Sequence, residues 1–115
     1  MSFQTALMTA LASVASGRVY PQIAPEKSVY PLVNYRILSK SPISTINGVV
    51  HAVDYQVVFE CWGATYTSAL ATAAAVRAAV IASGLNYSPT DEPGEDYEAT
   101  ADSFMEPVYY VFLYQ

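Results

Sequence analysis

Hydrophobic and polar residues alternate most regularly over residues 49–62, and this period of two predicts a β-strand. One face of that strand carries His51, Val53, Tyr55, Val57, Phe59 and Cys61, and the other carries Asp54, Gln56 and Glu60. Residues 32–38 alternate in the same way, and an apolar run predicts a last strand over residues 107–114. Such alternation is typical of an antiparallel sheet with one packed face and one wetter face.

Two other segments have the spacing of helices. Residues 2–15 carry an apolar stripe at intervals of four, four and three, and Gly17 follows as a residue suited to ending a helix. Thr65 is suited to capping a second, alanine-rich helix that runs to Ala82 and stops before Gly84. The alanines let this helix lie close to a sheet.

The remaining segments connect these elements. Two prolines in residues 19–25 predict an extended connector without regular pairing, and residues 39–48 predict a polar loop. Residues 97–103 allow at most a short strand. The order α-β-β-α-(β)-β predicts one α+β domain over residues 1–115, with two helices packed on one face of an antiparallel sheet of three to four strands.

The low content of charged residues suggests that this domain binds other subunits. The chain is 53% hydrophobic but only 13% charged, with a net charge of −5. This excludes a disordered chain and a broadly basic nucleic-acid binder, and one cysteine excludes a disulfide framework or a Cys-x-x-Cys zinc site. So few charges on a small domain predict that other subunits cover part of its surface. We expect no signal peptide and no membrane span, and hence synthesis and assembly in the cytoplasm.

The residues that could perform chemistry lie too far apart. His51 and Cys61 would be about 33 Å apart along one strand, and Asp54 and Glu60 about 20 Å. The acid-rich residues 91–98 lack the ligand spacing of a calcium loop, and no phosphate-binding, dinucleotide, zinc-protease or hydrolase motif occurs. The sequence therefore predicts no enzyme, no catalytic residue, no cofactor and no metal site.

Charge is distributed unevenly along the chain. Residues 1–90 hold five bases and three acids, whereas residues 91–115 hold seven acids and no base, for net charges of +2 and −7. The acidic segment is either a solubilising loop or a surface that repels nucleic acid or docks a basic partner.

Both faces of the terminal strand are apolar. A core on one side of the sheet would bury only one of these two faces. The residues on its second face, Tyr109, Val111 and Leu113, are covered either within the domain or by neighbouring subunits.

In order and spacing, these elements resemble the small tail-completion or tail-terminator proteins that join head and tail in long-tailed bacteriophages. The resemblance rests on a short N-terminal helix, the connector GRVYPQIAP, the strand YPLVNYRI, a loop, the strand YQVVFECWGATY and the helix SALATAAAVRAAV. It covers about residues 7–81, and the acidic segment departs from the pattern.

The resemblance implies a structural virion protein of the tail or neck. Members of the family form a ring, usually a hexamer, that caps the tail tube, ends its polymerisation and provides the surface for head–tail joining. The implied partners are other copies of the chain, the tail tube protein, head–tail connector proteins and, without sequence specificity, DNA in the channel.

Candidate contact residues follow from this resemblance. The loop of residues 39–48 is expected to touch the tube or a neighbouring subunit, through Lys40, Pro42, Ile43, Ile46 and Asn47. Five acids are candidates for the channel wall or for docking a partner: Asp91, Glu92, Glu95, Asp96 and Glu98. Two alternatives remain at this point, namely a head-completion or connector-adaptor protein of the neck, and a small ligand-binding α+β dimer.

Overall fold

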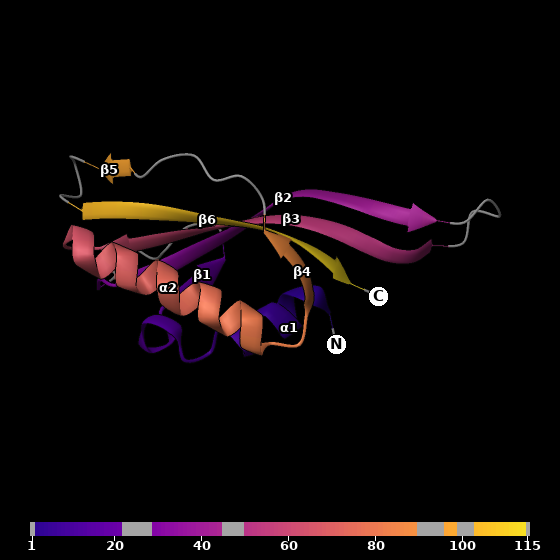
Figure 1. Ribbon diagram of the computed structural model, residues 1–115, viewed down its shortest axis with the longest axis horizontal. Coiled ribbons are helices and arrows are strands. Elements are labelled where there is room, and N and C mark those ends of the chain that lie inside the picture. The colour runs from indigo at the N-terminus through magenta and orange to yellow at the C-terminus, as the bar shows by residue number, and fades with distance from the viewer. Residues whose placement is uncertain (1, 22–28, 45–49, 90–95, 99–102, 115) are drawn as a thin grey trace.

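A six-stranded sheet with helices on one face forms the frame of the molecule (Figure 1). The computed structural model describes residues 2–21, 29–44, 50–89, 96–98 and 103–114. Its elements follow one another as α1 (Phe3–Ala10), the 3₁₀ turn η1 (Val14–Gly17), β1 (Val19–Pro21), β2 (Leu32–Ser44), β3 (Val50–Gly63), α2 (Tyr66–Ala82), β4 (Asn86–Pro89), β5 (Asp96–Glu98) and β6 (Ser103–Tyr114). The fold is therefore α+β, as the sequence predicts.

The sheet is larger and more mixed than expected. Its strand order is β1-β2-β3-β6-β4, with β5 also paired to β6. Strand β1 runs parallel to β2, whereas the other pairs are antiparallel. The prediction of three to four antiparallel strands is thus too low in number, and it is wrong in direction for β1 but right for the other pairs.

The strands that sequence reasoning missed lie at the sheet edges. The predicted unpaired connector contains β1, in which Val19 pairs with Val33 and Pro21 with Tyr35. A second short strand, β4, also ends in a proline, Pro89. Proline is tolerated at edges because the N–H that it lacks is not needed by an inner neighbour.

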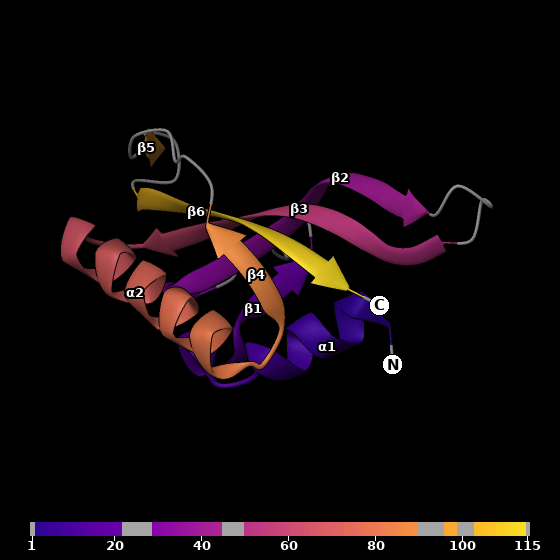
Figure 2. The ribbon, with the colours of Figure 1, turned by 45° about the vertical axis from the view of Figure 1, so that its right-hand side comes forward.

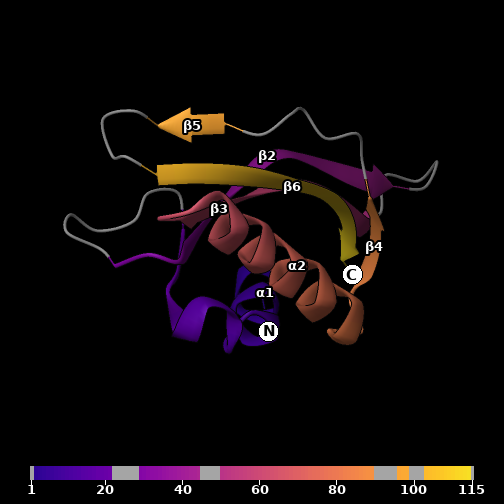
Figure 3. The same cartoon turned by 60° about the vertical axis from the view of Figure 1, so that its left-hand side comes forward.

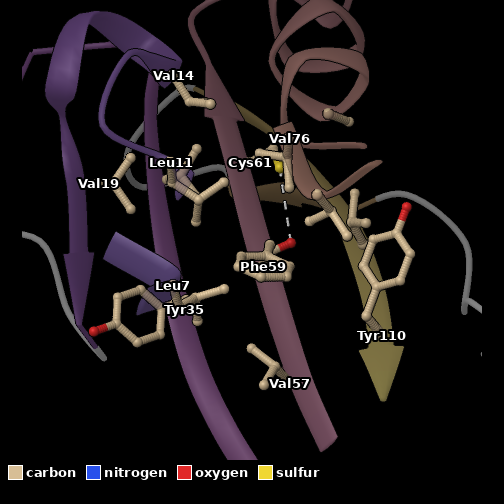
Figure 4. Close-up of a cluster of buried hydrophobic side chains, with 14 of the residues drawn as sticks. Leu7, Leu11, Val14, Val19, Tyr35, Val57, Phe59, Cys61, Val76 and Tyr110 are labelled. Carbon is tan, nitrogen blue, oxygen red and sulfur yellow. Dashed lines mark hydrogen bonds between the residues drawn. The ribbon is translucent and has the colours of Figure 1, made fainter. Parts of the chain in front are cut away.

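Both helices pack on the same face of the sheet, as predicted (Figure 1). Their apolar side chains meet those of β2, β3 and β6 in one core, part of which Figure 4 shows. From β3 the core receives Val57, Phe59 and Cys61, as the alternation predicts, and from β6 it receives Val108, Tyr110 and Phe112.

The predicted helix over residues 2–15 is shorter in the structure. Helix α1 ends at Ala10, and the chain turns through η1, where Ala15 has φ 51° and Gly17 has φ 85°. These positive φ values lie beyond the end of α1, where the chain leaves the 3₁₀ turn and enters β1. Leu11 and Val14 are nevertheless buried, so the predicted apolar stripe does contribute to the core.

Helix α2 begins and ends where the sequence predicts. The hydroxyl of Thr65 accepts a hydrogen bond from the Ser68 N–H at 3.1 Å, and Gly84 follows the helix with φ 77°. The approach to the helix is tight, because a Cβ on Gly63 would lie 2.5 Å from the backbone nitrogen of Ala69. Glycine at this position therefore lets β3 pass directly into α2.

Strands β2 and β3 extend beyond the rest of the sheet as a two-stranded ribbon (Figure 1). The pairing of β3 with β6 ends at Val53 and Tyr114, whereas that of β3 with β2 continues to Val50 and Ser44. We call residues 39–44 and 50–53, which include this ribbon and the part of β2 that leads into it, the hairpin arm (Figure 2). It contributes to the elongated shape of the chain, which measures 52 × 25 × 25 Å along its principal axes.

Candidate assembly surfaces

The part of the chain that the structure describes offers little for chemistry. Within it, no group of three His, Cys, Asp or Glu residues could hold a metal ion. Cys61 is fully buried beside Phe59 and Val76, and its thiol donates a weak hydrogen bond to the Phe59 carbonyl at 3.8 Å (Figure 4). His51 lies on the same strand near its opposite end. The fold thus keeps apart the two residues that a nucleophile pair would need.

The hairpin arm contains the residues that the sequence assigns to a loop. Lys40, Pro42 and Ile43 belong to β2, which runs through to Ser44, so the prediction of a loop from residue 39 is wrong. A bulge between Ile37 and Ser39 shifts the register, and pairing with β3 then gives this polar segment an extended conformation. The other two predicted contact residues, Ile46 and Asn47, lie outside the described residues.

The side chains of the arm are accessible. Lys40 and Pro42 are exposed, and Ile43 has 43% of its surface exposed opposite Ala52. Leu38, at the bulge where the arm begins, is 44% exposed. Ile43 on the projecting ribbon, and Leu38 at the start of the arm, provide apolar contact area where a partner can reach it.

A second candidate surface is the sheet face opposite the helices, which we call the outer face. It carries the predicted contact residues Tyr109, Val111 and Leu113 of β6, each partly exposed. Their neighbours in the chain, Tyr110 and Phe112, point into the core instead. Among the described elements no helix covers the outer face. The side chains of the terminal strand that the core does not bury therefore lie on this face.

Polar groups accompany these apolar residues on the outer face. Arg36 Nε lies 3.4 Å from a Glu60 carboxylate oxygen, in a pair whose arginine side chain is half exposed. Nearby, Asn34 Oδ1 and Trp62 Nε1 are buried and have no hydrogen-bond partner within the described structure. Each such atom costs about 1–3 kcal/mol of stability. The outer face is thus a mixed surface, which is typical of contacts between proteins.

Two of the five candidate acids of residues 91–98 lie on a strand at one edge of the sheet. Asp96 and Glu98 belong to β5, which pairs with the edge of β6 that β3 does not occupy. Asp91, Glu92 and Glu95 lie outside the described residues, between β4 and β5 in the chain. Since β4 pairs with the same edge of β6, the acidic segment connects two strands of one sheet edge.

Shallow hollows lie at the opposite edge, between α1 and β2. One of about 310 Å³ is lined by Pro21, Arg36, Leu38 and their neighbours, and an adjoining one of about 490 Å³ runs along α1 past Met8. Gln4 and Tyr35 line both. Burial raises the pKa of the Tyr35 phenol above its usual 10.0. Sequence reasoning did not identify Arg36 or Leu38 as site residues, although the excess of bases in residues 1–90 was a signal.

Comparison with known proteins identifies one family. The model of a family described as "Tail completion protein gp17" matches residues 3–98. No curated protein matches the chain. Within the described residues no helix is both long enough and apolar enough to cross a membrane.

Proposed function

The chain belongs to the tail completion protein gp17 family of phage tail proteins, and we propose that it caps the tail tube as a ring of identical subunits. The ring, a hexamer, ends polymerisation of the tube and provides the surface to which head–tail connector proteins bind. It is a structural part of the virion, assembled in the host cytoplasm. The observation that carries the proposal is the hairpin arm, which carries the exposed apolar side chain of Ile43 beyond the end of β6.

The arm is suited to contact with the tube or with a neighbouring subunit. Ile43 and Leu38 contribute apolar area, and Lys40 contributes a charge that orients the contact. The arm extends past Tyr114, where β6 ends, so a partner can reach it without disturbing the core. Ile46 and Asn47, which follow β2 in the chain, belong to the same proposed contact.

The outer face is suited to contact between subunits or with a connector protein. Tyr109, Val111 and Leu113 give it aromatic and aliphatic side chains, and the Arg36–Glu60 pair gives it polar groups. Tyrosine and arginine are enriched at protein interfaces. For the five acids of residues 91–98 the proposal allows two places, the channel wall and a subunit contact.

Substitution in the arm tests this function. Ile43→Asp places a charge in the proposed contact, and we expect binding to purified tail tubes to weaken by about tenfold or more, as measured by co-sedimentation. The fold should be unaffected, because Ile43 lies outside the core.

The matched control is Ile81→Asp, because Ile81 is also exposed but lies on α2, away from the arm. That variant should bind tubes like the wild type. If the wild-type chain binds purified portal rings and ignores tail tubes, it is a connector-adaptor protein, and the proposed capping of the tube is wrong.

A further inference from the structure

The side of α2 that faces away from the sheet carries no charged residue. Every exposed residue of this helix is an alanine, a threonine, a tyrosine or a larger aliphatic residue. The one charged residue of the helix is Arg77, whose Nη2 lies 3.9 Å from a carboxylate oxygen of Glu106. A surface helix normally has charged and polar residues on its solvent side, and a helix that is apolar all round is normally buried. The outward side of α2 therefore has the composition of a surface that a partner covers.

Two large side chains lie together in the first half of α2. Tyr66 is 45% exposed and Leu70 is 36% exposed, and because they are one turn apart their side chains are neighbours. The Tyr66 ring also meets the partly exposed Phe104 ring of β6, at 6.1 Å between centroids and an angle of 75°. Ala74 adds a small exposed side chain one turn beyond Leu70. We call Tyr66, Leu70, Ala74 and Phe104 the helix patch.

A surface of matching size lies on the outer face. Tyr109, Val111 and Leu113 of β6 are partly exposed there, and we call them the strand patch. The strand patch is about 13 Å long at the rise of a strand, and the helix patch from Tyr66 to Ala74 is about 12 Å long at the rise of a helix. Neither patch contains a charged residue, so a contact between them would remove no charge of its own from water.

The two patches of one subunit cannot meet, because they lie on opposite sides of its sheet (Figures 1 and 3). On its inner side, α2 shares one core with β6, to which the helix contributes Ala73 and Val76 and the strand contributes Val108 and Tyr110. Helix and strand are thus each apolar on two sides, of which the described structure covers one. Contact between the helix patch of one subunit and the strand patch of another covers both remaining sides with the helix-on-sheet packing that the domain already uses.

We propose that the helix patch of one subunit packs on the strand patch of a second copy of this chain. The contact joins two different surfaces and is therefore head to tail, the kind of interface that closes into a ring. A tube or connector protein bound to either patch would leave the other patch uncovered, whereas one repeated contact between copies covers both. This inference rests on the proposed ring and names the surfaces that meet in it.

The small size of the patches fits a contact that lasts only in a closed ring. Patches of this size bury on the order of 500 Å² together, whereas a stable pair of proteins buries about 1,200–2,000 Å². An isolated pair of subunits should therefore be short-lived. In a ring each subunit makes two such contacts, so the loss of one does not release it. The contact is accordingly best tested on tail tubes.

Cysteine cross-linking on tail tubes tests the proposal. Ala74→Cys and Val111→Cys place one thiol in each patch with little change in volume, and the native Cys61 is fully buried. With a short bismaleimide, we expect a cross-linked dimer from a mixture of the two variants and none from either variant alone. A chain that carries both substitutions should give a ladder of oligomers. In the control, Ala12→Cys replaces Ala74→Cys, because Ala12 is also exposed but lies outside both patches, and the yield should fall about tenfold or more.

A charge in the helix patch gives a second readout. For Leu70→Asp, we expect the protein concentration that gives rings on half of the tubes, counted by electron microscopy, to rise about tenfold or more. The matched control is Ile81→Asp, because Ile81 is exposed on the same helix but lies about 16 Å beyond Leu70. The control should form rings like the wild type.

Three outcomes would overturn the inference. Cross-linking of Ala74→Cys to itself would show that α2 meets α2 of a second copy, in a symmetric contact. Rings on tubes without a cross-link between the Ala74→Cys and Val111→Cys variants, or wild-type ring formation by Leu70→Asp, would show that other surfaces hold the ring together. Wild-type chain that forms no ring even on tail tubes contradicts the proposed function itself, so the two failures are distinguishable.

Discussion

Tyr35 lies where the core meets the two hollows between α1 and β2. It is 4% exposed, and burial raises the pKa of its phenol above the usual 10.0, because the low-dielectric surroundings disfavour the tyrosinate. The unfolded chain releases this proton near pH 10, whereas the folded chain retains it to higher pH. Tyr35 therefore favours folding below pH 10, and this contribution is lost as the pH rises above that value.

Replacement of Tyr35 by phenylalanine tests this linkage. We expect the free energy of unfolding of Tyr35→Phe, from urea titrations at a series of pH values, to fall less steeply above pH 10 than that of wild type. Tyr66→Phe is the control, because Tyr66 is 45% exposed on α2. Identical slopes for wild type and Tyr35→Phe would show that the buried phenol titrates as it does in the unfolded chain.

At the scale of elements, the passage from β3 into α2 depends on the absence of a side chain at Gly63. A Cβ there would lie 2.5 Å from the Ala69 nitrogen and 2.9 Å from Ser68 Cβ, so strand and helix would have to separate. At Gly84, by contrast, a Cβ would meet nothing within 4 Å, and only the positive φ opposes it.

These two glycines give a matched pair of substitutions. Gly63→Ala should lower the free energy of unfolding by about 3 kcal/mol, and Gly84→Ala by about 1 kcal/mol, which is the usual cost of a left-handed alanine. Denaturant unfolding measures both. Equal losses would mean that the junction of β3 and α2 adjusts freely.

Elements with a local sequence pattern, such as alternation or a helix cap, could be predicted from the sequence. Strands that form only because they pair with a neighbouring strand could not. The alternation of β3 and the Thr65 cap of α2 are local, so residues 50–63 and 66–82 match the expectation within a residue or two. Strands β1 and β4 contain prolines and depend on their neighbours in the sheet. The arm over residues 39–44 is polar and exists as a strand because it pairs with β3.

The candidate contacts divide in the same way. Ile43 could be chosen as a candidate from the sequence, since an isoleucine among polar residues stands out in any conformation, and the structure shows that it is exposed. The pairing of β1 with Val33–Tyr35 was not predictable, because it depends on contacts between strands and not on a local pattern. The position of β5 at the edge of β6 likewise required the strand order, although the uneven distribution of charge along the chain was visible in the sequence.

At the scale of the whole molecule, the features that suit this protein to binding partners lie on its surfaces. The helices and one sheet face bury the core, while the arm and the outer face remain for partners (Figures 1 and 3). The net charge of −5 is divided along the chain between a basic segment, residues 1–90, and an acidic one, residues 91–115. Accessible mixed surfaces on a small domain are in keeping with its membership of a phage tail protein family.

The proposed ring that caps the tail tube can be observed by electron microscopy of purified tail tubes mixed with the wild-type protein. We expect one ring of density at one end of each tube, and tubes that no longer elongate when tube protein is added. Tubes with bare ends that continue to grow, or protein spread along the tube walls, would contradict it.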